Sequence, residues 1–160
     1  MRKNDDRLKV LQSLAILDTA PEVVFDDLTR AMAQTFGVPI AMVSLLDADR
    51  DWFKGCVGFP ATESPASTSF CELFLNSDVE DVVVVEDTLQ DARFASHAMV
   101  VGPPHIRFYA AARLSVRGQT VGTLCAYDTS AKQISSDQIE ALKALSKAAM
   151  ELLAQRAGPI

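Results

Sequence analysis

The three cysteines carry the most reactive side chains of this sequence: Cys56, Cys71 and Cys125. The Ser-Phe-Cys-Glu motif at 69–72 has the spacing of a helix capping box, which places Cys71 at the second position of a short helix. Because a helix N-terminus favours negative charge, the Cys71 thiolate would form more readily than that of a free cysteine. Cys71 is therefore a candidate for a covalent ligand or for oxidation sensing. The alternative is a small apolar side chain packed in the core.

A second candidate lies on a predicted strand, where Arg107, Tyr109, Ala111 and Arg113 alternate onto one face. Two guanidinium groups with a phenol between them could hold a carboxylate or phosphate through paired hydrogen bonds. On this hypothesis, Arg113→Ala abolishes binding of an anionic ligand and leaves the fold intact. A solvated strand face or an ion pair is the alternative interpretation.

Other chemistries receive less support from the spacing. Cys71 could act as a nucleophile if the fold placed His97 or His105 beside it as a base. The cysteines lack the paired spacing of a zinc site, and the histidines are far from them in sequence. The segment 47–58 begins like a calcium loop, but its sixth and twelfth residues are not the required Gly and Glu. We therefore predict no metal, and the cofactor stays unknown.

Composition limits the protein to a single domain with its own core. The chain has 160 residues, of which 49% are hydrophobic, and its net charge is −6. That charge argues against binding to nucleic acid or to anionic lipid. No signal peptide precedes the first element, and no apolar run approaches the ~18 residues of a membrane span. An odd number of widely spaced cysteines favours reduced thiols, so we expect a cytoplasmic protein.

Helical periodicity marks both ends of the chain. Apolar residues recur at helical spacing over 5–17, and a Thr-Ala-Pro-Glu capping box at 19–22 predicts a second helix that ends at Gly37. Ser135 begins another capping box, which opens a long final helix. We expect one domain over 1–160, with an N-terminal helix in 1–18, a core in 19–155 and a tail in 156–160.

Between the helices, the pattern changes to that of strands. Apolar runs bounded by turn residues predict strands at 38–46, 51–57, 82–85, 107–117 and 119–127. Adjacent strands joined by tight turns pair antiparallel. The predicted fold class is α+β in three layers (α/β/α), with an antiparallel sheet of five to six strands and the N- and C-terminal helices packed on one face.

Seven short motifs, in this order along the chain, resemble those of bacterial GAF domains. They lie at 14–22, 38–41, 51–54, 69–71, 91–94, 106–109 and 122–125. The resemblance covers the chain from about Leu8 to Leu153 and implies a GAF-like (PAS/profilin-like) fold. It also implies a pocket on one face of the sheet and terminal helices that pair across a dimer. GAF domains are small-molecule sensors and dimerisation modules, usually attached to kinases, cyclases or phosphodiesterases.

The motifs that identify particular ligands depart from the GAF pattern here. The Asn-Lys pair of cyclic-nucleotide-binding members does not occur, and Glu72 follows Cys71 where bilin-binding members have histidine. Residues 111–114 are Ala-Ala-Arg-Leu where related domains often have Gly-Ala-Pro-Leu, which introduces the charge of Arg113. The resemblance specifies the fold and a general role, but not the ligand.

We expect the pocket between the sheet and the middle segments, with 58–68 and 95–104 as lids. Trp52 and Phe53 point to opposite faces of their strand, so one fills the core and the other lines the pocket, unless both pack in the core. The candidate ligand-binding residues are Trp52, Phe53, Phe70, Cys71, Phe94, Arg107, Phe108, Tyr109, Arg113 and Cys125.

Three functions fit these residues. The first is a sensor that binds a small molecule and signals to a downstream partner through the terminal helices of a homodimer. The second is an interaction module that binds no ligand, its pocket filled by Phe53, Phe70 and Phe108. The third is a thiol redox enzyme such as a free methionine sulfoxide reductase, in which Cys125 would resolve an oxidised Cys71.

Overall fold

A six-stranded antiparallel sheet forms the centre of the computed structural model, which describes residues 1–160. The strand order is β3-β2-β1-β6-β5-β4. The strands are β1 (Ile40–Leu46), β2 (Arg50–Val57), β3 (Glu63–Pro65), β4 (Val82–Val85), β5 (Phe108–Val116) and β6 (Gln119–Asp128). Tight turns join β1 to β2 and β5 to β6, as the sequence predicts; Arg117 and Gly118 at the second turn both have positive φ, at 52° and 76°.

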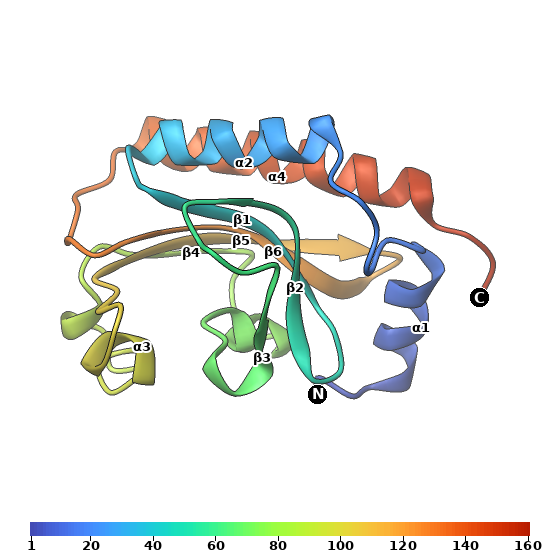
Figure 1. Ribbon diagram of the computed structural model, residues 1–160, viewed down its shortest axis with the longest axis horizontal. Coiled ribbons are helices and arrows are strands. Elements are labelled where there is room, and N and C mark those ends of the chain that lie inside the picture. The colour runs from blue at the N-terminus through green and yellow to red at the C-terminus, as the bar shows by residue number, and fades with distance from the viewer.

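Helices cover the two faces of the sheet unequally (Figure 1). The two long helices, α2 (Val23–Phe36) and α4 (Ser136–Arg156), lie side by side over one face. On the opposite face lie short segments, among them the helix α3 (Ala98–Val101) and the 3₁₀ turns η1 (Ala66–Thr68), η2 (Cys71–Leu75) and η3 (Thr88–Gln90). The first helix, α1 (Asp5–Ser13), lies beside the sheet near the start of the chain. The predicted α+β fold with three layers is confirmed.

A continuous core fills the space between the sheet and the long helices. It consists of 24 buried residues, all of them hydrophobic. Met32 of α2 and Leu142 of α4 are both 0% exposed and meet side chains such as Phe108 of β5 there. Burial of this size supplies most of the free energy that holds such a domain together. None of the helices combines the length and the apolar character needed to cross a membrane.

The helix boundaries near the start of the chain differ from the prediction. The first helix ends at Ser13, and α2 begins only at Val23. The capping box expected at 19–22 does not form, because the Thr19 hydroxyl donates to the carbonyl of Ile16 and Glu22 makes no side-chain cap. At the other end, the capping box of Ser135 is present as predicted. Local spacing at 19–22 was misleading because those side chains bond elsewhere in the fold.

Candidate functional site

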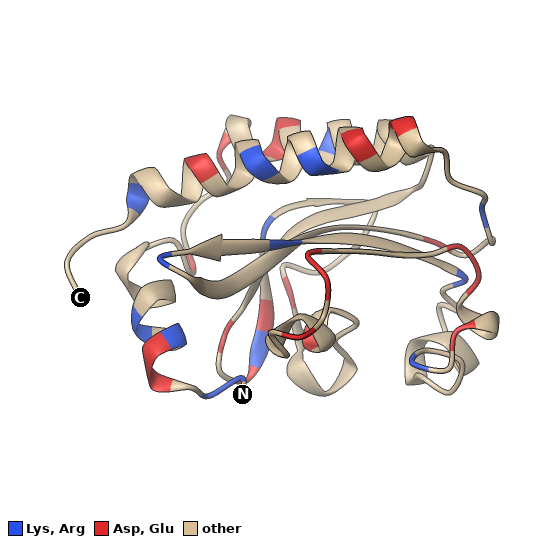
Figure 2. Ribbon diagram, turned by 180° about the vertical axis from the view of Figure 1, so that it is seen from behind, with Lys and Arg blue, Asp and Glu red and all other residues tan.

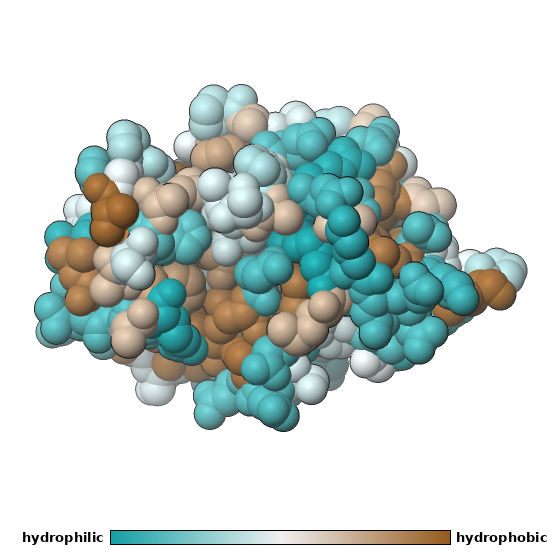
Figure 3. Space-filling view, turned by 90° about the horizontal axis from the view of Figure 1, so that it is seen from below, coloured by the Kyte–Doolittle hydropathy of each residue, from teal (hydrophilic) through white to brown (hydrophobic).

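A small cavity lies beneath the sheet, on the face opposite the long helices. Its volume is about 40 Å³. That is room for water but far below the ~300–1,000 Å³ of typical ligand pockets. Apolar side chains gather on this side of the molecule among polar segments (Figure 3). The cavity lining comprises Ile40, Met42, Asp51, Phe53, Phe59, Ser64, Thr68, Ser69, Phe70, Met99, Pro104, Ile106 and Tyr127.

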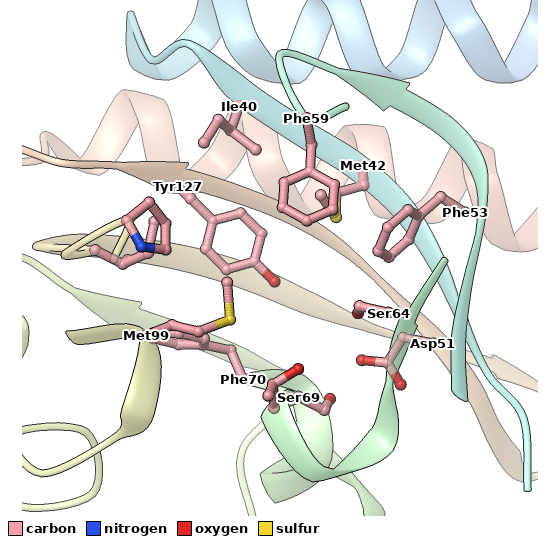
Figure 4. Close-up of a pocket in the computed structure, with 13 residues that line it drawn as sticks. Ile40, Met42, Asp51, Phe53, Phe59, Ser64, Ser69, Phe70, Met99 and Tyr127 are labelled. Carbon is pink, nitrogen blue, oxygen red and sulfur yellow. The ribbon is translucent and has the colours of Figure 1, made fainter. Parts of the chain in front are cut away.

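Aromatic rings form much of the cavity wall (Figure 4). The rings of Phe53 and Phe59 meet edge-on with centroids 5.7 Å apart, and those of Phe70 and Tyr127 meet in the same way at 5.5 Å. Edge-to-face contacts of this kind stabilise the wall beyond the apolar area that they bury. Flat, apolar ligand groups would therefore find a matching surface here.

Two chain segments close the cavity from the outside. Phe59 belongs to the loop after β2, and Met99 and Pro104 belong to α3 and the turn that follows it. The loop turns sharply at Gly58, whose φ is +77° and where an added Cβ would lie 1.9 Å from the carbonyl oxygen of Pro39. Only glycine fits at that position. Both segments lie within the ranges expected to act as lids.

The polar end of the cavity is built around Asp51. This carboxylate is 4% exposed, and its Oδ1 accepts a hydrogen bond of 2.9 Å from Arg2. Burial raises the pKa of Asp51, and the positive charge of Arg2 opposes that shift. Arg2 also binds Glu72, so one guanidinium joins the first residues of the chain to β2 and η2. The Ser69 hydroxyl oxygen is buried at this end, near enough to Asp51 to lower its pKa, but it has no hydrogen bond of normal geometry.

A cluster of thiol and hydroxyl groups lies deeper beneath the sheet. Cys71 is 1% exposed, and its Sγ lies 3.1 Å from the hydroxyl of Tyr109 and 3.0 Å from that of Thr123. The hydroxyl of Tyr127, which reaches the cavity, is 3.7 Å from the same sulfur. Cys125 is 0% exposed and neighbours Cys71. Neither cysteine lines the cavity, so both thiols are shielded from a small molecule bound there.

The two thiols of this cluster differ in pKa. Burial disfavours the Cys71 thiolate, but hydrogen bonds from the neighbouring thiol and hydroxyl groups outweigh it, so the pKa of Cys71 lies below its ordinary value. Burial and the nearby Cys71 raise the pKa of Cys125 well above its ordinary value. The sequence predicted that a helix N-terminus would lower the pKa of Cys71. Cys71 instead begins a 3₁₀ turn of five residues that lacks a side-chain cap, so the hydrogen bonds are the cause.

Comparison with known families identifies this architecture. The family model described as GAF domain matches residues 20–153. The chain belongs to the GAF family. A curated relative, the cyclic di-GMP phosphodiesterase PA2567 of Pseudomonas aeruginosa, is 34% identical over 123 residues. That match covers 76% of this chain but only 21% of the relative, so this GAF domain spans about a fifth of that protein's length.

Solved structures share the fold at low sequence identity. A type II free methionine-R-sulfoxide reductase from Thermoplasma acidophilum has a TM-score of 0.65 and 11% identity, covering 94% of this chain and 99% of its own. A phycocyanobilin-bound GAF domain from a cyanobacterial phytochrome has a TM-score of 0.64 and 14% identity, covering 95% and 94% of the two chains. One fold therefore carries an enzyme and a chromophore-binding domain, and the chemistry of a member must come from its own site.

The predicted site residues of this GAF domain divide into three groups. Phe53 and Phe70 line the cavity. Cys71, Phe94, Tyr109 and Cys125 lie behind the cavity wall in the same hydrophobic cluster. Trp52 and Phe108 lie on the other face of the sheet, among the residues beneath the long helices, which corrects the expectation that they contribute to the pocket. The alternation of Trp52 and Phe53 across β2 is as predicted.

Arg113 is a structural residue, and the predicted anion site does not form. The side chain is 8% exposed, and its nitrogens donate to Asp81, to the hydroxyl of Thr120 and to three backbone carbonyls. Arg107 is engaged as well, in paired hydrogen bonds of 3.1 and 3.0 Å to Asp87. The Arg113 guanidinium has no donor left for an anionic ligand, and the paired donors of Arg107 are taken by Asp87.

The predicted nucleophile–base pair does not form either. The hydrogen-bond partners of Cys71 are hydroxyl groups and the Cys125 thiol, whereas His97 accepts from the backbone of Met99 and packs against the ring of Phe70. Burial lowers the pKa of His97 below its ordinary value. The predicted contact between Cys71 and a histidine base is therefore not present in this structure.

Sequence reasoning missed Asp51, Ser69 and Arg2. Asp51 and Ser69 occur in motifs that were noticed for their neighbours, the aromatic residues after Asp51 and the cysteine after Ser69. An acidic residue at the start of an otherwise apolar strand is the signal that could have marked Asp51. Arg2 gave no such signal, because its contacts depend on how the chain start returns to the sheet.

Proposed function

We propose that this GAF domain is a sensory module that binds a small molecule in the cavity beneath the sheet. The observation that carries the proposal is the cavity itself, where an aromatic wall meets a buried Ser69 hydroxyl without a hydrogen-bond partner. Unsatisfied polar groups next to apolar walls are typical of binding sites and rare in packed cores. The relative's role in cyclic di-GMP turnover is consistent with a place in signalling.

The small volume links binding to a change of conformation. A cavity of about 40 Å³ accepts more than water only if Phe59 and Met99 move outward. Those two side chains come from the two lid segments, so a ligand would favour an arrangement of the lids different from the empty one. Such differential affinity is what a sensor requires in order to transmit a signal.

The experiment is native mass spectrometry of the gently purified protein. We expect added mass that disappears on denaturation, because nothing in the site favours a covalent link. The matched variant Ile40→Trp fills the cavity from β1 and should remove the added mass, whereas Leu89→Trp, at a side chain 48% exposed, should retain it. Unchanged added mass in Ile40→Trp would show that the molecule binds elsewhere.

We propose further that two copies pair through the layer formed by α2 and α4 and pass the signal to a partner protein. Val23 and Val24, at the start of α2, are 70% and 46% exposed. The outer surface of α4 carries interspersed acidic and basic residues, which could pair across such an interface (Figure 2). Light scattering over a range of concentrations tests the dimer, and Val24→Glu should shift it toward monomer. A monomer at all concentrations would refute the pairing.

A scaffold without a ligand is the second candidate, and the small cavity favours it. Phe53 and Phe70 fill part of the space, as that hypothesis requires, although Phe108 lies on the other face of the sheet. The native mass spectrum separates the two functions, because a scaffold would give a dimer with no added mass.

A further inference from the structure

We propose that the ligand is a small ring-bearing amine, with its nitrogen at Asp51 and its ring against the aromatic wall. This inference rests on the proposed function, because it names the chemical class that the same cavity would select. It is opposite in sign to the anionic ligand that the sequence suggested.

The first observation in favour of an amine is the charge of the cavity lining. Among the side chains that line the cavity, Asp51 is the only carboxylate and Tyr127 the only phenol; lysine, arginine and histidine are missing from the lining. A carboxylate or phosphate group would therefore meet the Asp51 carboxylate, which Arg2 binds from outside the cavity, and would find no cation in the lining itself. A protonated amine would instead form a charge-assisted hydrogen bond in a poorly solvated site.

The second observation is the geometry of the contacts that Asp51 makes. Arg2 approaches this carboxylate from the chain start and binds Oδ1, and Arg2 itself does not line the cavity. The other oxygen, Oδ2, receives no hydrogen bond from Arg2, and the Ser69 hydroxyl lies near enough to this carboxylate to lower its pKa. Asp51 and Ser69 lie at the same end of the cavity (Figure 4). A ligand nitrogen placed there could donate to Oδ2 of Asp51 and to the oxygen of the Ser69 hydroxyl together.

The third observation is the apolar part of the cavity lining. Phe53, Phe59 and Tyr127 offer ring faces and edges, which suit an aromatic ring and also attract positive charge. Met42 and Met99 are unbranched and can repack around a ring of modest size. One polar corner with a largely apolar remainder matches a molecule that has a single nitrogen and a single ring.

Three probes of nearly equal size test the inference: 2-phenylethylamine, 2-phenylethanol and phenylacetate. Their affinities are measured on the whole chain by calorimetry or by ligand-observed NMR. We expect the amine to bind about tenfold more tightly than the alcohol, and phenylacetate to bind more weakly than both. In Asp51→Asn the advantage of the amine should disappear, while the affinity for the alcohol stays the same.

The matched control is Glu72→Gln. Glu72 contacts the same Arg2 guanidinium but does not line the cavity, so its loss should leave the preference for the amine unchanged. Equal loss of preference in both variants would overturn the inference, because the charge would then act through Arg2. If Asp51→Asn does not fold, the ranking of the three probes on the unaltered protein still tests the preference for an amine.

The outcomes also separate this inference from the proposed function. Equal affinities for the amine and the alcohol would overturn the preference for an amine and leave a binding cavity in place. Absence of binding by all three probes, together with a native mass spectrum free of added mass, would overturn both.

Discussion

The two faces of the sheet are filled in different ways. Beneath α2 and α4 lies a cluster of 24 buried hydrophobic residues that includes no cysteine and no tyrosine. On the other face, the cluster has 14 buried residues, includes two thiols and a tyrosine, and adjoins a cavity. Long helices cover the first face and short turns cover the second (Figure 1). The first face holds the domain together, and the second keeps space and unsatisfied polar groups that a binding site needs.

Strand β2 shows the same contrast within four residues. Lys54 faces the helices and is 0% exposed, and its ammonium group binds Glu22, the Thr19 hydroxyl and the carbonyl of Ala20. Asp51 faces the cavity and has Arg2 as its charged partner on one oxygen only. A buried charge whose hydrogen bonds are all satisfied, such as that of Lys54, is structural. A buried charge with an oxygen left over marks the site.

The largest expected effect comes from a matched pair of methionines on the two faces. Met32→Ala, at a side chain 0% exposed under the helices, should lower the free energy of unfolding by about 2–5 kcal/mol. Met99→Ala, at the partly buried cavity wall, should lower it by less than about 1.5 kcal/mol and enlarge the cavity. Urea denaturation measures both. Equal losses would contradict the division of roles between the faces.

Arg113 tests the rule about satisfied charges. Arg113→Ala leaves the carbonyls of Phe74, Asn76 and Val79 without their donors and should lower the free energy of unfolding by about 2–4 kcal/mol. The pair with Asp81 contributes little to this loss, because the Asp81 side chain is 86% exposed.

Arg107→Ala is the control for Arg113. Its partner Asp87 is partly exposed, so the denaturation midpoint should barely move. A native-like midpoint for Arg113→Ala would return Arg113 to the list of candidate ligand contacts.

A smaller effect is expected in the thiol cluster. Cys71→Ala removes the sulfur that the hydroxyls of Tyr109 and Thr123 contact, and should lower the free energy of unfolding by about 1–2 kcal/mol. Cys71→Ser keeps a group that donates and accepts there, so it should recover part of the loss. Thermal unfolding followed by circular dichroism measures both. A loss of ligand mass in Cys71→Ser with unchanged stability would instead point to covalent attachment.

The smallest effect concerns acid on the helix side. A hydrogen bond from Lys54 holds the pKa of Glu22 below its ordinary value of 4.5, and Arg156 adds to the shift. A depressed carboxyl pKa contributes stability above the ordinary value, and that stability is lost as the pH falls through the pKa of the folded state. Glu22→Gln should therefore lower the unfolding midpoint at pH 7 and have no effect near pH 3. A constant difference at both pH values would show that charge is not the cause.

Much of the fold could be predicted from the sequence, because the motifs that determine its helix ends and turns are local. The Ser135 capping box and the turn at Gly118 depend on neighbours within a few residues, and both formed. The antiparallel pairing of β1 with β2 and of β5 with β6 was predicted from their tight turns, whereas the central pairing of β1 with β6 was not. The segment 19–22 was predicted wrongly, because its side chains, which have the spacing of a helix cap, bond to other parts of the domain instead.

The site was accessible only in part, because its decisive contacts are long-range. Phe53 and Phe70 were identified from motifs, and both lid ranges contribute lining residues. The role of Arg113 was wrong because its acceptors lie in the segment 74–81, which has no periodic pattern to place it. The contact between Arg2 and Asp51 joins residues 49 positions apart and follows only from the finished fold.

That contact has a practical consequence. Arg2 binds the cavity carboxylate but does not line the cavity, so the first residues of the chain lie next to Asp51 at the start of β2. A fluorophore coupled to the amino group of Met1, which is 78% exposed, would be held close to Asp51 without entering the cavity. Its emission would then report occupancy directly, and the chain start would serve as a built-in indicator for screening.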